Sequence, residues 1–334
     1  MHVLITGHTG FKGSWLTVLL SQLGHDVSGI SLEPVAGGAF VSANVEDLLK
    51  NHAICDVRDK AGISGYISRI NPDAVIHMAA QPLVIEGYRD PSGTIDINVS
   101  GTLNVLEACR ESTNVRAVLV VTTDKVYKDK GIGNYSEEDE LGGFDPYSAS
   151  KAMADLLAQT YGNLGLHFKV GIARAGNVIG LGDVSANRLI PDITRAFIRS
   201  EMLTVRHLGA VRPWQHVLDC VNGYILALYG LVEDISPEPG ALVLNFGPEP
   251  AGYKTVGEVI DEARIVLGEL RVTPVNPFVK ETNFLTLNSS KARAILDWSD
   301  KLDFSSAIGW SLESLPSRLD RRMMQSQVAR YLDM

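Results

Sequence analysis

The first thirty residues alternate a strand-like run, a glycine-rich turn, a helix-like run and a second strand-like run, and this order constrains the fold most. His2–Thr6 is a short apolar run bounded by glycine, which predicts a buried strand. From Ser14 to Gly24 the large apolar residues recur at helical spacing, which predicts an amphipathic helix ended by glycine. Asp26–Ser31 predicts a second strand. The result is a β-α-β unit, the building block of a parallel sheet.

The turn inside this unit carries three glycines in the pattern G-x-x-G-x-x-G, at Gly7, Gly10 and Gly13. Glycine allows a tight turn and lets the backbone approach a pyrophosphate, whose charge then meets the free amides at the helix N-terminus. The spacing differs from the commoner G-x-G-x-x-G, and a purely structural turn is the alternative. Its place between a strand and a helix favours a dinucleotide site that includes Thr9 and Phe11 with the three glycines.

The end of the second strand indicates which dinucleotide is bound. An acidic residue commonly lies there and binds the adenosine ribose. Ser31 occupies this place, Glu33 follows two residues later, and no arginine is near in sequence. Because a 2′-phosphate would need a basic residue, the sequence favours NAD over NADP.

The alternation of strands and helices continues through the first half of the chain. His52–Asp56, Asp73–His77 and Ala117–Val121 predict strands, and Thr94–Arg110 predicts a long helix. Continuous apolar runs fit a parallel sheet that is covered on both faces. We therefore predict an α/β fold with a doubly wound parallel (Rossmann) sheet in residues 1–173.

Two further pairs of residues follow predicted strands and complete the expected cofactor contacts. Asp56 and Val57 follow one strand, and Ala79 and Ala80 follow the next. Small residues at a strand end let a cofactor lie against the backbone, although close helix packing would also select them.

The candidate catalytic residues come after the last of these strands. Thr123, Asp124 and Lys125 follow it directly, and Tyr147 and Lys151 lie four apart on one face of a predicted helix that ends near Gly162. A phenol is a poor base at neutral pH, but a nearby ammonium and a cationic nicotinamide ring lower its pKa. The Y-x-x-x-K spacing is common by chance and a surface pair is the alternative. Its place after a complete dinucleotide-binding half favours dehydrogenase chemistry.

Several motifs together resemble those of the extended short-chain dehydrogenases, and most closely the CDP-D-glucose 4,6-dehydratase family. The matching segments are Gly7–Leu16, His77–Val84, Thr122–Lys125, Leu141–Ser148, Arg174–Gly180 and Arg212–Val217, with a weaker match at Ser289–Arg293. Two segments depart from the family pattern, Lys128–Tyr135 and Arg206–Leu208. Both are expected near the substrate, so they bear on the choice of sugar and nucleotide.

The resemblance implies a role for each catalytic candidate. Thr123, Tyr147 and Lys151 would oxidise the hexose at carbon 4 with bound NAD. Asp124 would then protonate the leaving hydroxyl of carbon 6, Lys125 would assist at carbon 5, and the hydride would return to carbon 6. The product of CDP-D-glucose would be CDP-4-keto-6-deoxy-D-glucose. A lysine serves as a base only where its pKa is lowered, and a structural ion pair with Asp124 is the alternative for Lys125.

The rest of the chain, residues 174–334, predicts a smaller mixed α/β lobe that binds the substrate, with some segments returning to the Rossmann sheet. A guanidinium can bind phosphate oxygens bidentately, so Arg188 and Arg212 are the candidates for the diphosphate. Asn177, Gln81 and His216 complete the predicted substrate contacts. Ion pairs are the alternative for the arginines, and a structural role is the alternative for His216.

Composition narrows the partners. The net charge of −9 disfavours nucleic acid, whose phosphates are bound by clustered Lys and Arg. Three separated cysteines and the absence of a long apolar run predict a reducing compartment, no membrane span and a cytoplasmic location. The eight histidines show no metal-ligand spacing, so no metal is predicted.

The resemblance also implies an assembly, a homodimer or a dimer of dimers. In related proteins the helices at about 94–111 and 147–163 form a four-helix bundle between two copies. Five leucine and valine residues on these helices are expected to be buried with or without a partner: Leu103, Val105, Leu106, Leu156 and Leu157.

Other functions on the same fold stay open from the sequence. They are a 4,6-dehydratase of another nucleotide sugar, a sugar-nucleotide 4-epimerase, and a non-catalytic protein that senses dinucleotides. An epimerase has no use for an acid–base pair at carbons 5 and 6, and sensing proteins commonly lack the tyrosine at the position of Tyr147.

Overall fold

A seven-stranded parallel sheet forms the centre of the computed structural model, which describes residues 1–131, 133–235, 239–275, 284–313, 315 and 319–334. The strand order is β11-β6-β5-β4-β1-β2-β3, and each neighbouring pair is parallel. The strands are β1 (His2–Thr6), β2 (Asp26–Ser31), β3 (Asn51–Ile54), β4 (Ala74–His77), β5 (Ala117–Val121), β6 (Lys169–Ala175) and β11 (Leu242–Phe246). The predicted doubly wound fold is confirmed.

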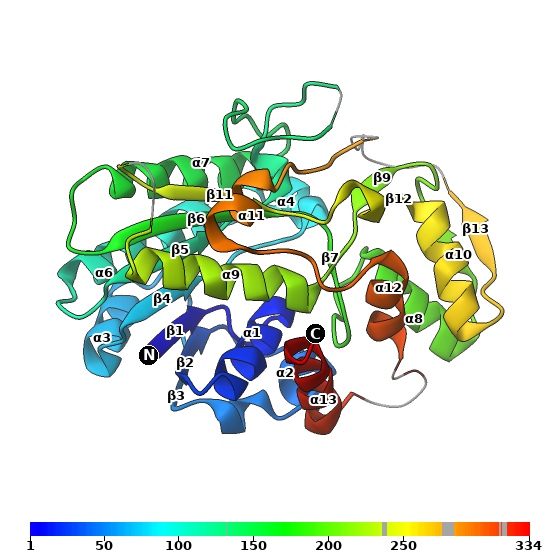
Figure 1. Ribbon diagram of the computed structural model, residues 1–334, viewed down its shortest axis with the longest axis horizontal. Coiled ribbons are helices and arrows are strands. Elements are labelled where there is room, and N and C mark those ends of the chain that lie inside the picture. The colour runs from blue at the N-terminus through cyan, green and yellow to red at the C-terminus, as the bar shows by residue number, and fades with distance from the viewer. Residues whose placement is uncertain (132, 236–238, 276–283, 314, 316–318) are drawn as a thin grey trace.

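Helices cover both faces of the sheet (Figure 1). One face carries α1 (Phe11–Gln22) and α9 (Val217–Val232), and the other carries α3 (Lys60–Ile70), α6 (Gly101–Glu111) and α7 (Pro146–Gly162). Successive residues of a strand point to opposite faces, so Leu119 of β5 packs with the first set and Val118 with the second. The strands are therefore apolar at nearly every position.

The direction of the strand order reverses between β1 and β4, where the chain crosses from one half of the sheet to the other. The loops that leave the carboxyl ends of β1 and β4 diverge at this point. Ligands of open α/β sheets bind in the crevice that results. The glycine-rich turn after β1 and the residues after β4 and β5 therefore meet at one edge of the sheet.

Two of the predicted helices differ from the structure. The first begins at Phe11, three residues before the predicted start at Ser14, because the chain enters the helix directly after Gly10. It is not amphipathic: Gly13 to Leu20 are buried without interruption, since α1 packs against α9 and the C-terminal helix α13 (Arg321–Leu332) as well as the sheet.

The predicted long helix over residues 94–110 is divided into three parts. A short helix α5 (Pro91–Ile95) leads into a π-helical turn over Asp96–Ser100, and α6 follows. The turn directs the buried side chain of Asn98 toward its partners, since Asn98 accepts a hydrogen bond from the Gln81 amide at 2.8 Å and donates to Ser150 at 2.8 Å. Such turns inside helices occur often at functional sites.

A second, smaller group of elements lies beside the carboxyl edge of the sheet. It contains the strand pairs β8 (Leu203–Val205) with β13 (Val272–Pro274) and β9 (Val211–Pro213) with β12 (Tyr253–Thr255). Helices α8 (Leu189–Arg199), α10 (Val256–Leu267) and α12 (Phe304–Leu312) pack around them, and β7 (Val178–Ile179) pairs with β10 (Gln215–His216). The chain also passes back into the Rossmann sheet at β11 and α9, so the division near residue 173 stays a prediction.

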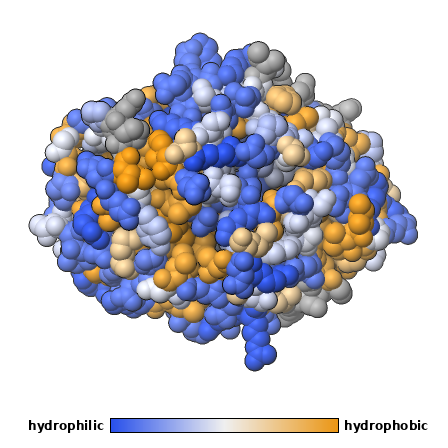
Figure 2. All heavy atoms as spheres, viewed as in Figure 1, coloured by the Kyte–Doolittle hydropathy of each residue, from blue (hydrophilic) through white to orange (hydrophobic). Residues whose placement is uncertain are grey.

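The remaining short elements connect these parts. They are α2 (Ala39–Ser42), α4 (Val84–Arg89), α11 (Ser290–Leu296) and the 3₁₀ turns Val45–Leu48, Asp124–Val126 and Pro250–Gly252. Hydrophilic residues cover most of the face shown in Figure 2, with apolar residues gathered left of the centre and again toward the right side. Among the described residues no helix is both long and apolar enough to cross a membrane.

The prediction that five apolar residues of the two bundle helices are all buried is wrong for two of them. Val105 and Leu106 are fully buried and Leu157 packs partly against the core. Leu103 is 39% exposed and Leu156 is 52% exposed. These two leucines point away from the sheet, on the outer side of α6 and α7.

Candidate active site

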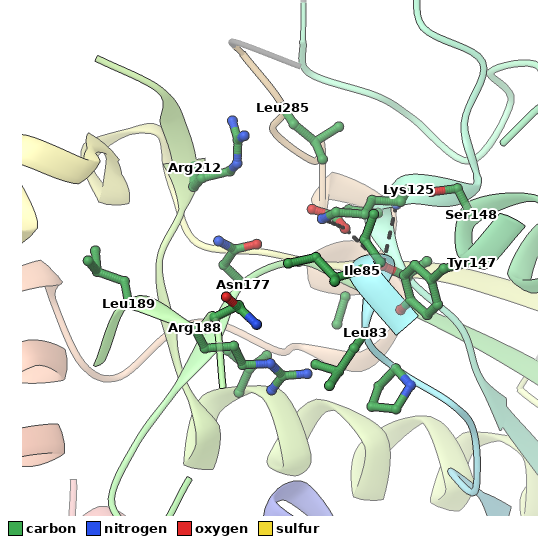
Figure 3. A pocket seen from close by; sticks show the side chains of 18 of the residues that line it. Leu83, Ile85, Lys125, Tyr147, Ser148, Asn177, Arg188, Leu189, Arg212 and Leu285 are labelled. Carbon is green, nitrogen blue, oxygen red and sulfur yellow. Dashed lines mark hydrogen bonds and ion pairs between the residues drawn. The ribbon is translucent and has the colours of Figure 1, made fainter. Parts of the chain in front are cut away.

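A cavity of about 620 Å³ opens at the carboxyl edge of the sheet, between the Rossmann half and the second group of elements. Figure 3 shows Tyr147 and Lys125 on one side of it and Asn177, Arg188 and Arg212 on the other. All five catalytic candidates line this cavity, which we call the active-site cavity.

Tyr147 and Lys151 are placed by the start of α7. The Asp145 side chain accepts a hydrogen bond from the Ser148 amide at 3.0 Å, and Pro146 occupies the first helical position, so the helix starts just before Tyr147. Both side chains are more than nine-tenths buried. The Lys151 ammonium donates to the carbonyl oxygen of Val121 at 3.0 Å, which fixes it at the end of β5.

Burial is the main cause of the pKa shifts of both Tyr147 and Lys151. Burial raises the pKa of Tyr147 to about 12, and contact with Thr123 opposes that rise only in part. Burial, followed by the positive charge of Lys12, lowers the pKa of Lys151 to about 7. Desolvation therefore dominates the Tyr147 pKa in the protein alone, and the lowering expected from the Lys151 ammonium and a bound nicotinamide ring stays a prediction.

The turn after β5 brings together the two residues assigned to dehydration. Thr123 donates to Asp124 Oδ1 at 2.9 Å, and the Lys125 ammonium donates to the same oxygen at 3.3 Å. Asp124 is almost fully buried, and its Oδ2 has no hydrogen-bond partner among the described residues. A Cβ at Gly176 would lie 3.1 Å from Oδ2, so the glycine keeps a side chain from crowding this oxygen. The ion pair with Lys125 that was left open as an alternative is present.

A buried ion pair behind the cavity joins this turn to the catalytic helix. The Arg174 guanidinium binds both oxygens of Asp155 on α7, at 2.9 and 2.7 Å. Asp155 also accepts from Thr122 at 2.9 Å, and Arg174 donates to the Tyr127 hydroxyl at 2.9 Å. Since Thr122 and Tyr127 flank the Asp124 turn, this group, the Arg174–Asp155 clamp, fixes the turn relative to Tyr147.

The glycine-rich turn has the features that a dinucleotide diphosphate needs. Gly7 has φ +79°, and a Cβ there would lie 2.8 Å from the amide nitrogen of Ala79; a Cβ at Gly13 would lie 2.4 Å from the Gly7 carbonyl oxygen. A Cβ at Gly10 would meet only that same oxygen, at 3.3 Å, so its outer side is open. The first turn of α1 has no side-chain cap and no acidic residue, so its amides are available to an anion. The residues present fit NAD.

The other predicted contacts to the adenosine half lie at the ends of β2 and β3. The Thr9 hydroxyl donates to the carbonyl oxygen of Leu32 at 3.0 Å and lies 2.8 Å from the Ser31 hydroxyl. The Asp56 carboxylate is bound by the Arg58 guanidinium at 2.7 Å, which lowers the pKa of Asp56. Their role in binding the cofactor stays a prediction.

The apolar members of the predicted cofactor set have different surroundings. Ala80 lines the active-site cavity, and Ala79 lies next to it against Gly7. Phe11 packs beside the core at the start of α1. The Val57 side chain is buried against Gly101, where a Cβ would lie 2.6 Å away, so its side chain serves packing and only its backbone faces the strand end.

The predicted substrate contacts divide into two groups. Asn177, Arg188 and Arg212 line the active-site cavity, and Arg188 is paired with Asp183 at 3.2 Å. Gln81 does not line it, because its amide bonds to Thr94 at 2.8 Å and accepts from the Leu83 amide at 2.6 Å.

His216 does not line the cavity either. It is fully buried, caps α9 by accepting from the Leu218 amide at 3.3 Å, and packs edge-on against Trp15 and Trp310. Burial lowers its pKa to about 3. These surroundings fit the structural role that is the alternative to substrate binding for His216.

Sequence reasoning missed one polar residue that lines the cavity, Lys12, and one that bonds to Gln81 and Ser150 outside it, Asn98. Lys12 lines the active-site cavity, and its ammonium donates to the Tyr224 hydroxyl at 3.0 Å. The signal was a lysine among the small and apolar residues of the glycine motif. Asn98 was hidden inside a regular helical pattern, which gives no sign of a π-helical turn.

The segments that depart from the family pattern also contribute to the cavity. Asp129 and Tyr135 line it from the first segment, and Arg206 and His207 line it from the second. Both departures therefore line the active-site cavity, where the substrate contacts are predicted.

The family comparison identifies most of the chain. Residues 3–239 match the family described as "NAD dependent epimerase/dehydratase family". The matched region covers the glycine-rich turn, the turn after β5, the Y-x-x-x-K helix and the three cavity arginines, Arg188, Arg206 and Arg212.

Individual relatives combine this fold with different reactions. The CDP-glucose 4,6-dehydratase of Salmonella typhimurium is 38% identical over 322 residues, covering 92% of this chain and 88% of that protein. The dTDP-glucose 4,6-dehydratase of Streptomyces griseus is 31% identical and covers 66% of this chain and 68% of its own. The solved UDP-glucose 4-epimerase of Thermus thermophilus, a complex with NAD, has a TM-score of 0.79 at 25% identity and covers 94% and 98% of the two chains.

Proposed function

The chain belongs to the NAD dependent epimerase/dehydratase family, and on that premise we propose that it converts CDP-D-glucose to CDP-4-keto-6-deoxy-D-glucose. Its class is that of the NAD-dependent nucleotide-sugar 4,6-dehydratases, which are hydro-lyases. The observation that carries the proposal is the Asp124–Lys125 pair in the wall of the cavity that also holds Tyr147 and Lys151.

NAD is the cofactor, and when bound it would supply the hydride acceptor for sugar carbon 4, the hydride donor for carbon 6, and a positive charge that favours the phenolate of Tyr147. The α1 N-terminus and Gly10 hold its diphosphate. Tyr147 takes the proton of the carbon 4 hydroxyl, with Thr123 in contact beside it. Lys151, fixed on Val121, would hold the nicotinamide ribose.

The ketone at carbon 4 acidifies the proton on carbon 5, which makes loss of water possible. We assign the proton donated to the departing carbon 6 hydroxyl to Asp124, whose Oδ2 is buried and without a partner among the described residues. Asp124 takes this proton from the Lys125 ammonium across their 3.3 Å contact, which leaves Lys125 neutral. Lys125 assists proton removal at carbon 5 from the partly exposed side of the same turn. The Arg174–Asp155 clamp keeps these two residues at a fixed separation from Tyr147.

The diphosphate of the substrate needs local positive charge in an acidic protein. Arg188 and Arg212 line the cavity opposite Tyr147, and Asn177 lies between the two arginines in the view of Figure 3. Guanidinium groups bind phosphate oxygens in pairs. We propose these three residues as the diphosphate contacts.

The direct test is conversion of sugar nucleotides by the purified protein. We expect CDP-glucose to lose the mass of one water, with slower or no conversion of UDP-, dTDP- and GDP-glucose in parallel reactions. Conversion of another nucleotide sugar instead would change the assigned nucleotide. An epimer of unchanged mass would show that the reaction is 4-epimerisation and not dehydration. Tight NAD binding with no conversion of any substrate would indicate a sensing protein.

We further propose that the enzyme acts in the cytoplasm as a homodimer or a dimer of dimers. The exposed Leu103 and Leu156 on the outer side of α6 and α7 support a pairing of these helices between two copies. Light scattering after size exclusion should give at least twice the mass of the chain. Exchange of both leucines for glutamate should give the monomer, and an unchanged mass would reject this interface.

A further inference from the structure

Lys12 is a lysine of the active-site cavity that the proposed reaction does not use. It lies in the first turn of α1, two residues after Gly10, and its side chain reaches the cavity that holds Tyr147 and Lys151. Its charge interacts with those of Asp124, Arg188 and Lys151. The residue therefore links the cofactor turn to the reacting groups.

Among the described residues, the Lys12 ammonium has a neutral hydrogen-bond partner, the phenol of Tyr224. It donates to the hydroxyl of Tyr224 at 3.0 Å and lies 5.3 Å from the centre of that ring. Tyr224 is fully buried on α9 and held edge-on against Phe246, with ring centres 5.7 Å apart. A fixed phenol thus determines where the ammonium lies, and it does not neutralise the charge.

Burial lowers the pKa of Lys12, and the charge of Arg188 acts in the same direction, whereas Asp124 and the thiol of Cys220 raise it. On α7 the charge of Lys12 acts on Lys151, whose own neighbouring carboxylate is Asp155. Placing a second ammonium close to Lys151 is unfavourable in a partly buried site. Such an arrangement is typical of functional sites rather than of structural ion pairs.

We propose that Lys12 is a positioning residue for the redox step, whose charge makes the site bind NADH more tightly relative to NAD⁺ than it otherwise would. The inference rests on the proposed function, because Tyr147 and Lys151 then define where the nicotinamide reacts. The oxidised ring carries a positive charge and the reduced ring carries none. A cation at Lys12 therefore disfavours the oxidised form, which assists removal of the hydride from carbon 4.

The test measures binding of each cofactor separately to the full chain, without sugar nucleotide, by titration calorimetry. Lys12→Met removes the charge at similar side-chain length, and the ratio Kd(NADH)/Kd(NAD⁺) should rise about tenfold, the order expected for one unit charge in a partly buried site. Lys12→Arg keeps the charge and should retain the wild-type ratio. Tyr224→Phe keeps the charge but removes its anchor, and should give a smaller rise.

Lys50→Met is the matched control, because Lys50 is exposed and paired with Asp26 at the opposite edge of the sheet. It should leave the ratio unchanged. An unchanged ratio in Lys12→Met, with both cofactors bound, would overturn the proposal and leave the proposed function standing. If Lys12→Met does not fold, Lys12→Gln gives the same comparison. A wild-type protein that binds neither cofactor would overturn the proposed function as well.

Discussion

The cofactor side and the substrate side of the cavity are built in different ways. On the cofactor side the proposed contacts come from backbone at the ends of adjacent strands, from glycines and from the N-terminus of α1. On the substrate side they come from side chains far apart in the chain, such as Asp124, Asn177 and Arg212. A site made of backbone depends on local conformation, whereas a site made of side chains depends on the whole fold. Substitutions should therefore act differently on the two sides.

The largest effect is expected at Tyr147. Tyr147→Phe removes the group that takes the proton at carbon 4, and product formation should fall about 10³-fold. The cofactor side should be unaffected, so NAD affinity and the unfolding temperature should stay within error. Product can be followed by mass spectrometry. Tyr161→Phe on the same helix is the matched control, and a Tyr147→Phe enzyme with a tenth of wild-type activity would reject the assignment.

Asp124→Asn should separate the two chemical stages. The amide keeps the hydrogen bond from Thr123 but cannot give up a proton, so product formation should fall about 10²-fold while oxidation at carbon 4 continues. Bound NADH should then accumulate on addition of substrate and be visible in the near-ultraviolet absorbance. Asp26→Asn, exposed at the other end of the sheet, should do neither. Loss of product without NADH would place Asp124 in the oxidation instead.

Two glycines of the cofactor turn should respond differently. Gly13→Ala puts a Cβ 2.4 Å from the Gly7 carbonyl oxygen, so the free energy of unfolding should fall by about 2–3 kcal/mol. Gly10→Ala meets that oxygen at 3.3 Å and should leave stability nearly unchanged, yet NAD affinity should fall about tenfold because the methyl group occupies the open side of the turn. Denaturant unfolding and calorimetry measure the two quantities. Equal effects of both variants on stability would contradict this division.

The smallest effect concerns the attachment of the C-terminal helix to the Rossmann half. Asp219 on α9 is buried and accepts from the Tyr331 hydroxyl of α13 at 2.9 Å and from the Lys301 amide at 2.8 Å. Burial raises its pKa to about 7. The folded protein therefore binds this proton more tightly than the unfolded chain, so the contribution to stability is complete below about pH 4 and is lost as the pH rises to 7.

Thermal unfolding between pH 5 and 8 measures this contribution. The wild-type protein should lose about 2 kcal/mol over that range, and Asp219→Asn should lose much less because the amide does not ionise. Asp333→Asn, exposed near the chain end, should follow the wild type. If the stability of Asp219→Asn falls with pH as steeply as that of the wild type, another group is responsible. The contact between Asp219 and α13 would then not cause the pH dependence.

The sequence predicted the cofactor side more completely than the substrate side. Strand ends and glycine spacing are local, so the turn at Gly7–Gly13 and the Y-x-x-x-K pair could be placed from a few neighbouring residues. Gln81 and His216 lie in matching motifs too, but their side chains bond within the protein, and only the fold determines which way a side chain points. The exposure of Leu103 and Leu156 was missed because a leucine at helical spacing can face the core or a partner subunit. The π-helical turn was missed because its residues continue the same helical pattern as the helices on either side.

The Arg174–Asp155 clamp has a consequence for how reactions diversify on this fold. It holds the turn after β5 through Thr122 and Tyr127, on either side of the two dehydration residues and through neither of their side chains. We expect that Asp124 and Lys125 can therefore be exchanged without moving Tyr147. Oxidation at carbon 4 would then be the inherited part of the chemistry, and the bond broken afterwards would be the part that is free to evolve.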